Sequence, residues 1–544
     1  MPRDTQADAA TVAQIEAAAR AQDIPRAVEM ARRALDDGLV HPMLLNLRSV
    51  WWTRQGRDRE AMADLKQAME IAPEDRFVRN AYGILLGKHA RWDEALAVFR
   101  ESVRLAPDFA VAQYSLGWVL ESTGEIAEAA VQYERARALD PDFVQPLVRL
   151  SSLAYRRADW ETARTLALRA LALRPGDYVA LTTLGSVAVA DGNFEQAEEI
   201  IRRLVAAKPP TPLDGAFART ALGDLRHAQG RYAQAFAAYT AANREKFKLY
   251  AAQYDRPGTT VTDYCHWLAS YFARAEAAQW SASAQTAPDD PRDGATGHIF
   301  LVGFPRSGTT LLENVLASHP GIATLEERDM LSDATRTFLI DEAGRDRLAI
   351  LSDAEIAEWR ARYWAQAREY GAAIADKVFI DKYPLTTIKL PLIAKLFPKA
   401  RILFALRDPR DVVLSCYRRS FGMNSSMFEF LDLERAAKFY DAVMTLAGVY
   451  REHLGLDWRE ARHEALIANF ETEARAICDF IGVEWNAAMS DFAEHAKGRT
   501  IRTPSSTQVV KGINREGMAV WKNYEAEMRP VMELLETWIE KFEH

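Results

Sequence analysis

A proline recurs every 34 residues through the first half of the chain, at Pro73, Pro107, Pro141, Pro175 and Pro209. An alanine has the same period, at Ala27, Ala61, Ala95, Ala129, Ala163 and Ala197, and at Ala235 after a four-residue insertion around PPTPLDG. Proline cannot continue a helix, so each proline marks the end of one. A unit of this length holds two antiparallel helices. A long coiled coil would instead need heptads, which do not produce this period.

Glycine shares the period at Gly83, Gly117 and Gly185, and at Gly223 after the insertion, while Ser151 fills that position in one unit. This pattern resembles the tetratricopeptide repeat, in which small residues let neighbouring helices pack closely. The resemblance predicts an all-α solenoid of seven units over residues 1–250. Repeat solenoids have a concave groove that usually binds a protein or peptide. A solenoid can also serve only to position a second domain.

The repeat pattern fades after residue 250. Residues 251–297 continue as a helical extension and end in SASAQTAPDDPRDGATG, which has the composition of a linker. The remaining residues, 298–544, are expected to form a separate domain.

Composition limits the class of protein. The net charge of −8 argues against general nucleic-acid binding. Cys265, Cys416 and Cys478 have neither disulfide-framework nor zinc-site spacing, which favours a reducing compartment. No apolar window reaches the length of a membrane span and no signal-peptide core is visible, so we expect a cytoplasmic protein with no membrane partner.

The stretch HIFLVGFPRSGTTLLENVLASHP, residues 298–320, is typical of a strand, a phosphate-binding loop and a helix. Gly303 and Gly308 have the P-loop spacing, but Thr309 stands in the lysine position and Thr310 in the hydroxyl position. A P-loop kinase would need that lysine to reach the outer phosphates of ATP, together with an acidic magnesium ligand. The loop therefore favours a nucleotide whose transferred group follows a single 5′-phosphate.

Three further blocks accompany the loop in order: KVFIDKYPLTTIKL, KARILFALRDPRDVVLSCYRRS and RTPSSTQVVKGINREGMAVWKNY. Together the four blocks resemble the tyrosylprotein sulfotransferases and the bacterial repeat-fused sulfotransferases. The resemblance covers roughly the last 245 residues of the chain. It implies an α/β domain of the P-loop type with a parallel sheet.

The resemblance also implies a donor, phosphoadenosine phosphosulfate (PAPS), and no metal. Its 5′-phosphosulfate group would be bound by Arg306, Ser307, Gly308, Thr309 and Thr310. Its 3′-phosphate would be bound by Arg407, Ser415 and Arg419, where arginine supplies forked donors for a dianion. Lys382 would stabilise the leaving phosphate, Ser505 and Arg306 the transferring group, and Lys511 belongs to a segment that covers the nucleotide.

The general base is a choice between two neighbouring carboxylates. Glu326 matches the Gly-Glu-Glu run of the tyrosine-sulfating enzymes, whereas the bacterial relatives align a Gly-Glu-Leu run on Glu327. This chain has Leu325 in place of the glycine, so both candidates stay open.

The sequence thus predicts a PAPS-dependent sulfotransferase that acts on an acceptor hydroxyl, with a tyrosine of a protein or peptide docked on the repeats as the favoured acceptor. The alternatives are a P-loop kinase, or a non-catalytic repeat scaffold with a vestigial nucleotide-binding domain. The acceptor and the oligomeric state are not determined by the sequence.

Overall fold

The structure is a computed structural model that describes residues 5–89, 91–274, 280, 294–497 and 512–543. The chain divides into two compact units. The first comprises Met1–Leu153 and Thr162–Ala180, and the second comprises Ala154–Glu161 and Leu181–His544. The second unit includes the last repeat helices as well as the C-terminal region, and the domain boundaries expected at residues 250 and 297 stay predictions.

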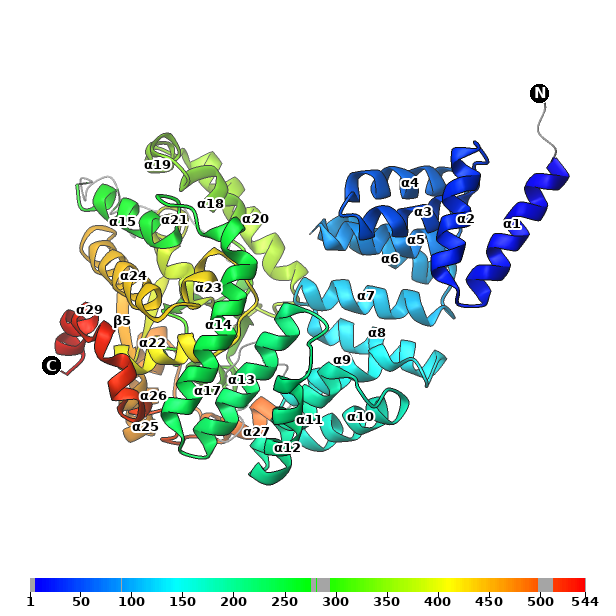
Figure 1. Cartoon of the computed structure of the whole chain (residues 1–544). Helices are drawn as coiled ribbons and strands as arrows, with labels where there is room; N and C mark the ends of the chain where they lie inside the picture. Colours follow the sequence, from blue (N-terminus) through cyan, green and yellow to red (C-terminus); the bar gives the residue numbers. More distant parts are fainter. Residues whose placement is uncertain (1–4, 90, 275–279, 281–293, 498–511, 544) are drawn as a thin grey trace. The chain divides into compact units, whose positions relative to one another are not determined.

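The repeats consist of consecutive helix pairs, seven within the described residues (Figure 1). The helices are α1 (Thr5–Arg20), α2 (Ile24–Asp36), α3 (Pro42–Arg54), α4 (Asp58–Ile71), α5 (Arg76–Lys88), α6 (Trp92–Leu105), α7 (Ala110–Ser122), α8 (Ile126–Leu139), α9 (Val144–Arg156), α10 (Trp160–Leu173), α11 (Tyr178–Ala190), α12 (Phe194–Ala206), α13 (Pro212–Ala228) and α14 (Tyr232–Tyr254). The expected all-α repeat solenoid is confirmed.

The recurring glycine of the repeats has a packing role. A Cβ added at Gly83 would lie 2.6 Å from the Phe99 ring, and one added at Gly117 would lie 2.7 Å from the Tyr133 ring. These rings lie sixteen residues after the glycine, on the second helix of the pair. Where Ser151 replaces the glycine, the residue sixteen positions later is Ala167, and both are buried. A smaller residue at the second position explains why the repeat accepts a serine at the first.

The second unit contains a five-stranded parallel sheet in the order β2-β3-β1-β4-β5. Its strands are β1 (Gly297–Gly303), β2 (Ile322–Glu326), β3 (Val378–Lys382), β4 (Arg401–Leu406) and β5 (Asp457–Arg462). Because all strands are parallel, their carboxyl ends meet at one edge of the sheet, where α/β proteins bind ligands. The predicted parallel α/β architecture is confirmed.

Alternate residues of the central strand β1 enter two separate apolar cores. Phe300 and Val302 belong to the larger core, and Ile299 and Leu301 belong to the smaller one. A strand with both faces buried is apolar throughout, as the sequence of β1 is.

The sheet is accompanied by helices α15 (Val261–Phe272), α17 (Thr309–Ala317), α18 (Ser332–Phe338), α19 (Glu342–Ala349), α20 (Asp353–Glu369), α21 (Leu390–Leu396), α22 (Pro409–Arg418), α23 (Ser425–Glu429), α24 (Leu433–His453), α25 (His463–Ala468), α26 (Phe470–Ile481), α27 (Phe492–Lys497) and α29 (Glu525–Glu543), and by short 3₁₀ segments η2 (Pro384–Lys389), η3 (Ala487–Asp491) and η4 (Val520–Tyr524).

The last repeat helix, α14, packs against α22, α23 and η4 of the same unit (Figure 1). The Thr240 and Tyr417 hydroxyls form a hydrogen bond of 2.7 Å, and the Asn243 amide donates to the Tyr417 carbonyl at 2.8 Å. Farther along α14, the Phe247 ring stacks on Phe428 with ring centroids 4.7 Å apart. The final repeat is therefore part of the structural core of the α/β unit. Across the described residues, none of the helices has the length and apolarity that a membrane span requires.

Candidate functional site

The loop between β1 and α17 depends on two glycines with left-handed backbone angles. Gly303 has φ +148°, and a Cβ there would lie 2.6 Å from the Ala405 carbonyl oxygen on β4. Gly308 has φ +93°, and a Cβ there would lie 2.6 Å from Nδ1 of His463. Only glycine fits both positions without displacing a neighbour. The helix that follows begins at Thr309, so its N-terminus and its positive dipole end lie at this loop.

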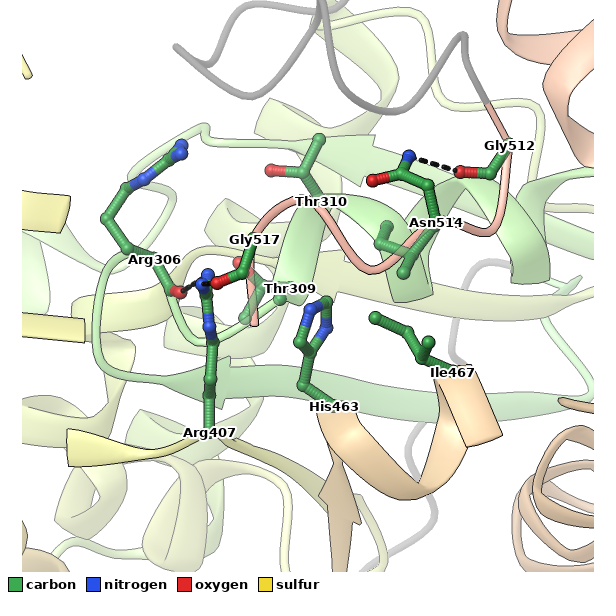
Figure 2. A pocket seen from close by; sticks show the side chains of 11 residues that line it. Arg306, Thr309, Thr310, Arg407, His463, Ile467, Gly512, Asn514 and Gly517 are labelled. Carbon is green, nitrogen blue, oxygen red and sulfur yellow. Dashed lines mark hydrogen bonds between the residues drawn. The ribbon is translucent and has the colours of Figure 1, made fainter. Parts of the chain in front are cut away.

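A pocket opens beside the loop at the carboxyl edge of the sheet (Figure 2). Its empty space, including the part open to solvent, is about 580 Å³. The lining residues are Arg306, Gly308, Thr309, Thr310, Leu311, Arg407, His463, Ile467, Gly512, Asn514 and Gly517. Two arginines and a helix N-terminus in one concave wall are features that favour the binding of an anion.

Arg407 follows the last residue of β4, and its guanidinium bridges two chain segments. Nη1 donates to the Arg306 carbonyl at 3.1 Å, and Nη2 donates to the Gly517 carbonyl (Figure 2). The Nε–H is buried and has no hydrogen-bond partner among the described residues. A buried charged donor without an acceptor is costly, so an anion in the pocket would relieve it.

Arg306 is a second buried guanidinium at the same site. Its Nε donates to the Ser415 hydroxyl on α22 at 3.0 Å. Burial, followed by repulsion from Arg419 and Arg407, lowers the pKa of Arg306 to about 9. Mutual repulsion of this kind is relieved when an anion binds between the cations, so the charges as well as the shape suit a phosphate or sulfate group.

The end of β3 carries the third cation, Lys382, which is completely buried. Its Nζ lies 3.2 Å from Oε1 of Glu326 and 3.1 Å from Oε1 of Glu327. A third carboxylate, that of Glu313 on α17, lies 3.5 Å away. Burial alone would lower the pKa of Lys382, but attraction to these carboxylates outweighs it and raises the pKa, so the ammonium stays charged.

Comparison with known proteins agrees with this geometry. The profile of the sulfotransferase family matches residues 298–487, and a tetratricopeptide-repeat profile matches residues 81–142, 148–212 and 182–246. The chain combines tetratricopeptide repeats with a domain of the sulfotransferase family.

The sequence relatives are distant. A Drosophila melanogaster protein-tyrosine sulfotransferase is 26% identical over 240 residues, which are 41% of this chain and 46% of that protein. An Aquifex aeolicus protein described as uncharacterized is 25% identical over 254 residues, 45% of this chain and 33% of its own length. The chain therefore spans less than half the length of these two relatives. Among solved structures, the type IV pilus biogenesis factor PilW aligns with a TM-score of 0.33 and 20% identity, over 38% of this chain and 96% of PilW.

The sulfotransferase domain brings most of the predicted site residues to one edge of the sheet. Of the loop residues, Arg306, Ser307, Thr309 and Thr310 are buried, and Gly308 forms the N-cap of α17. Lys382 joins Glu326 and Glu327, but both carboxylates contact it, so its contacts do not single out a base. Ser505 and Lys511 lie outside the described residues, and residues 512, 514 and 517 of the same block line the pocket.

The predicted 3′-phosphate set is only partly assembled. Arg407 lines the pocket, whereas Ser415 and Arg419 are absent from its lining. Ser415 accepts the hydrogen bond from Arg306, and a guanidinium nitrogen of Arg419 lies 3.8 Å from the carboxylate of Asp224 on α13. Arg419 ends the α22 helix, so its side chain leaves the helix next to the last repeat.

His463 is not among the site residues that the sequence predicted. His463 starts α25 directly after β5, and its ring lines the pocket near Arg407 (Figure 2). Burial, together with the charges of Arg407 and Arg306, lowers its pKa to about 3, which keeps the imidazole neutral. His463 could have been predicted as a site residue from its position at the carboxyl end of a parallel strand, where α/β proteins bind ligands.

Asp411 was also missed, although it anchors the C-terminal block. Its carboxylate accepts the backbone N–H of Ala519 at 2.6 Å and that of Trp521 at 2.9 Å. The neighbouring Arg410 guanidinium lies 4.2 Å from the centroid of the Trp521 ring. Asp411 therefore connects α22 to the segment that supplies the Gly517 carbonyl to Arg407. Among the described residues, no group of three or more His, Cys, Asp or Glu side chains is arranged to hold a metal ion.

Proposed function

We propose that this protein transfers a sulfuryl group from PAPS to an acceptor hydroxyl. The observation that supports this proposal most directly is the combination of two features at the carboxyl edge of the sheet, on the two strands that flank β1. One is the pocket wall in which buried Arg407 keeps an unpartnered Nε–H, and the other is the charged Lys382 beside Glu326. The first feature suits the phosphates of a nucleotide, and the second suits a reaction in which a hydroxyl loses a proton while a phosphate leaves.

In this proposal Arg306, Ser307, Gly308, Thr309 and Thr310 bind the 5′-phosphosulfate group. Arg407, with Ser415 and Arg419 at the end of α22, binds the 3′-phosphate. Thr309 occupies the position of the P-loop lysine and carries no charge, and Lys382 supplies the missing cation from β3. A neutral His463 ring beside Arg407 adds a wall for the nucleotide without adding charge.

The chemical step is an in-line displacement at sulfur. The acceptor oxygen forms a bond to sulfur, and its proton passes to a glutamate. The bond between sulfur and the bridging oxygen breaks, and its electron pair remains on the 5′-phosphate, which Lys382 stabilises. Ser505 would contact the transferring group together with Arg306. Each such electrostatic contact is typically worth about 2–4 kcal/mol of barrier.

We propose Glu326 as the base and keep Glu327 as the alternative. Glu326 is the last residue of β2 and its side chain is 9% exposed, so packing fixes its position better than that of Glu327, which is 30% exposed. Glu327 has φ +48°, and its backbone N–H donates to the Lys382 carbonyl at 2.7 Å. These contacts hold the turn after β2 and leave its side chain nearer to solvent.

We further propose that the acceptor is a tyrosine on a protein or peptide whose remote part docks on the repeats. The exposed apolar side chains of Phe77 and Ile84 on α5 support such a docking surface. A cytoplasmic location belongs to the same proposal, and the free, buried state of Cys265, Cys416 and Cys478 agrees with it.

The direct test combines nucleotide binding with transfer. The protein is titrated with phosphoadenosine phosphate and with ATP–magnesium in a calorimeter, and is then incubated with labelled PAPS and a panel of peptide, sugar and lipid acceptors. Tight binding of phosphoadenosine phosphate with label transfer to a hydroxyl supports the proposal. Binding of ATP–magnesium alone would establish a kinase. Tight phosphoadenosine phosphate binding without transfer to any acceptor would indicate a scaffold.

A further inference from the structure

Glu313 is a buried carboxylate for which the proposed reaction has no stated use. It lies on α17, four residues after Thr309, and its side chain is only 1% exposed. One carboxylate oxygen, Oε2, lies 3.5 Å from Nζ of Lys382, and the other, Oε1, accepts the Thr324 hydroxyl of β2 at 3.0 Å. An ionic group with so little exposure is retained in a fold only when it is paired.

The three carboxylates around Lys382 differ in their freedom to move. Glu313 is held by the helix, by its burial and by Thr324. Glu327 is 30% exposed and follows the end of a strand. A lysine ammonium has three N–H donors, and two of them donate to Glu326 and Glu327, so a donor phosphate would compete with these carboxylates for Lys382. Glu327 is the carboxylate that can turn toward solvent at the least cost, whereas Glu313 has no space to do so.

We propose that Glu313 is a positioning residue, the fixed counter-ion that aims the ammonium of Lys382 at the leaving group. This inference rests on the sulfotransferase function proposed above and adds a residue to it. When Glu326 takes the proton of the acceptor, its attraction for Lys382 falls. Glu313 then supplies the remaining fixed negative charge, so Lys382 stays charged and in place while the phosphate departs.

The test compares Glu313→Gln with a matched control, Glu429→Gln. Glu429 is also a buried glutamate of the same unit, 3.0 Å from Nε of Arg435, and it has no part in the proposed site. We expect Glu313→Gln to lower kcat about tenfold or more, with KM for PAPS and Kd for phosphoadenosine phosphate changed less than about twofold. Glu313→Asp should recover part of the lost kcat because it restores the charge. Glu429→Gln should lower the unfolding midpoint and leave kcat within about twofold of the parent value.

A second variant acts on Glu313 without removing its charge. Thr324→Val deletes the hydroxyl that holds Oε1 and should lower kcat about threefold, again with unchanged nucleotide affinity. This variant also decides the matter if Glu313→Gln does not fold, because a kcat equal to that of the parent protein would then overturn the inference.

The other outcomes are equally decisive. If Glu313→Gln transfers sulfate as fast as the parent protein, or if Glu429→Gln loses as much kcat, Glu313 has no positioning role. A failure of the proposed function looks different, because the parent protein would then transfer no label to any acceptor. In that case the inference falls with the function it rests on.

Discussion

The carboxylate of Asp224, on the last pair of repeat helices, lies 3.8 Å from the guanidinium of Arg419 at the end of α22. The Tyr239 hydroxyl of α14 donates a hydrogen bond of 2.8 Å to Oδ1 of Asp224, the same oxygen that lies nearest Arg419. The guanidinium of Arg418 lies 5.3 Å from the centroid of the Tyr239 ring. All of these residues belong to one compact unit. In the proposed function, Asp224 would therefore compete with the 3′-phosphate for Arg419.

The two proposed 3′-phosphate arginines should respond unequally to substitution. Arg407→Ala should raise the Kd for phosphoadenosine phosphate about tenfold or more, because a charge-assisted, forked contact is lost. Arg419→Ala should act in the same direction but less, because Arg419 must first leave Asp224. Adenosine phosphosulfate, which lacks the 3′-phosphate, should bind both variants almost as well as it binds the parent protein. Calorimetry with both ligands measures this, and an equal loss for the two ligands would mean that the arginines only maintain the fold.

Substitution of the two candidate bases should separate them. Glu326→Gln should preserve nucleotide affinity and lower kcat by about a hundredfold or more, because the acceptor proton loses its destination. Glu327→Gln should have a smaller effect. Steady-state kinetics with saturating PAPS provides the comparison, and the reverse order would assign the base to Glu327.

Asp381 should make the stability of the protein depend on pH. Burial raises its pKa to about 7, against the opposing effect of a hydrogen bond from the Tyr363 hydroxyl at 2.8 Å. In the unfolded chain the Asp381 carboxyl has its ordinary pKa of 3.8. Between pH 3.8 and about pH 7, the folded protein therefore keeps a proton on Asp381 that the unfolded chain has lost. The stabilisation by neutral Asp381 is therefore complete below pH 3.8 and is lost as pH rises through about 7.

Asp381→Asn keeps an acceptor for Tyr363 and cannot ionise. We expect it to be more stable than the parent protein above pH 7, by an amount on the order of a few kcal/mol, with the difference vanishing toward pH 4. Denaturant unfolding across this pH range measures the effect. Asp457→Asn, at a position with a mostly exposed side chain, is the control and should show no such trend. A pH-independent difference for Asp381→Asn would contradict the assignment.

A chain that begins at Gly297 should fail to fold cooperatively. The larger apolar core of the α/β unit includes Tyr239, Leu268 and Phe272, all of which such a truncation removes. Deleting one large buried side chain typically costs about 2–5 kcal/mol, and the total stability of a domain is about 5–15 kcal/mol. Circular dichroism and thermal unfolding of the truncated chain give the answer. A cooperative transition near that of the full chain would show that the last repeat helices are dispensable.

Docking of the acceptor is therefore better tested by point substitutions in the first unit. Phe77 and Ile84 lie seven residues apart on one face of α5 and are 56% and 44% exposed. Replacing both with alanine should lower kcat/KM for a protein acceptor about tenfold and leave a short acceptor analogue unaffected. Leu168→Ala removes a comparably exposed side chain on α10 and is the control. An unchanged kcat/KM for the protein acceptor would mean that the acceptor docks on another surface or does not dock on the repeats at all.

The sequence predicted those parts of the structure in which a short local pattern determines the outcome. The 34-residue period predicted the helix pairs, and the pattern of residues 298–320 predicted the strand, the loop and the helix that follows. Parallel strands then required Arg306, Lys382 and Arg407 to meet at one edge of the sheet.

Side-chain partners could not be predicted in the same way. Glu313 occupies a helix position that a polar residue normally takes when it faces solvent, and only the packing of α17 against β1 and β2 turns it toward Lys382. The pairing of Arg419 with Asp224 joins residues nearly two hundred positions apart. The integration of α14 into the α/β unit was likewise invisible, since a repeat helix has the same pattern whether its neighbour is another repeat or a different domain.

The strand order β2-β3-β1-β4-β5 gives the edge of the sheet a direction. Along the carboxyl edge of the sheet, from β2 to β5, the residues at the strand ends are Glu326, Lys382, Arg306 in its loop, Arg407 and His463. This spatial order differs from their order in the sequence. The carboxylates of Glu326 and Glu327 lie at the β2 end, and the guanidinium groups of Arg306 and Arg407 follow β1 and β4. In the proposed reaction the hydroxyl compound would approach from one flank and the nucleotide from the other, with sulfur meeting oxygen between them.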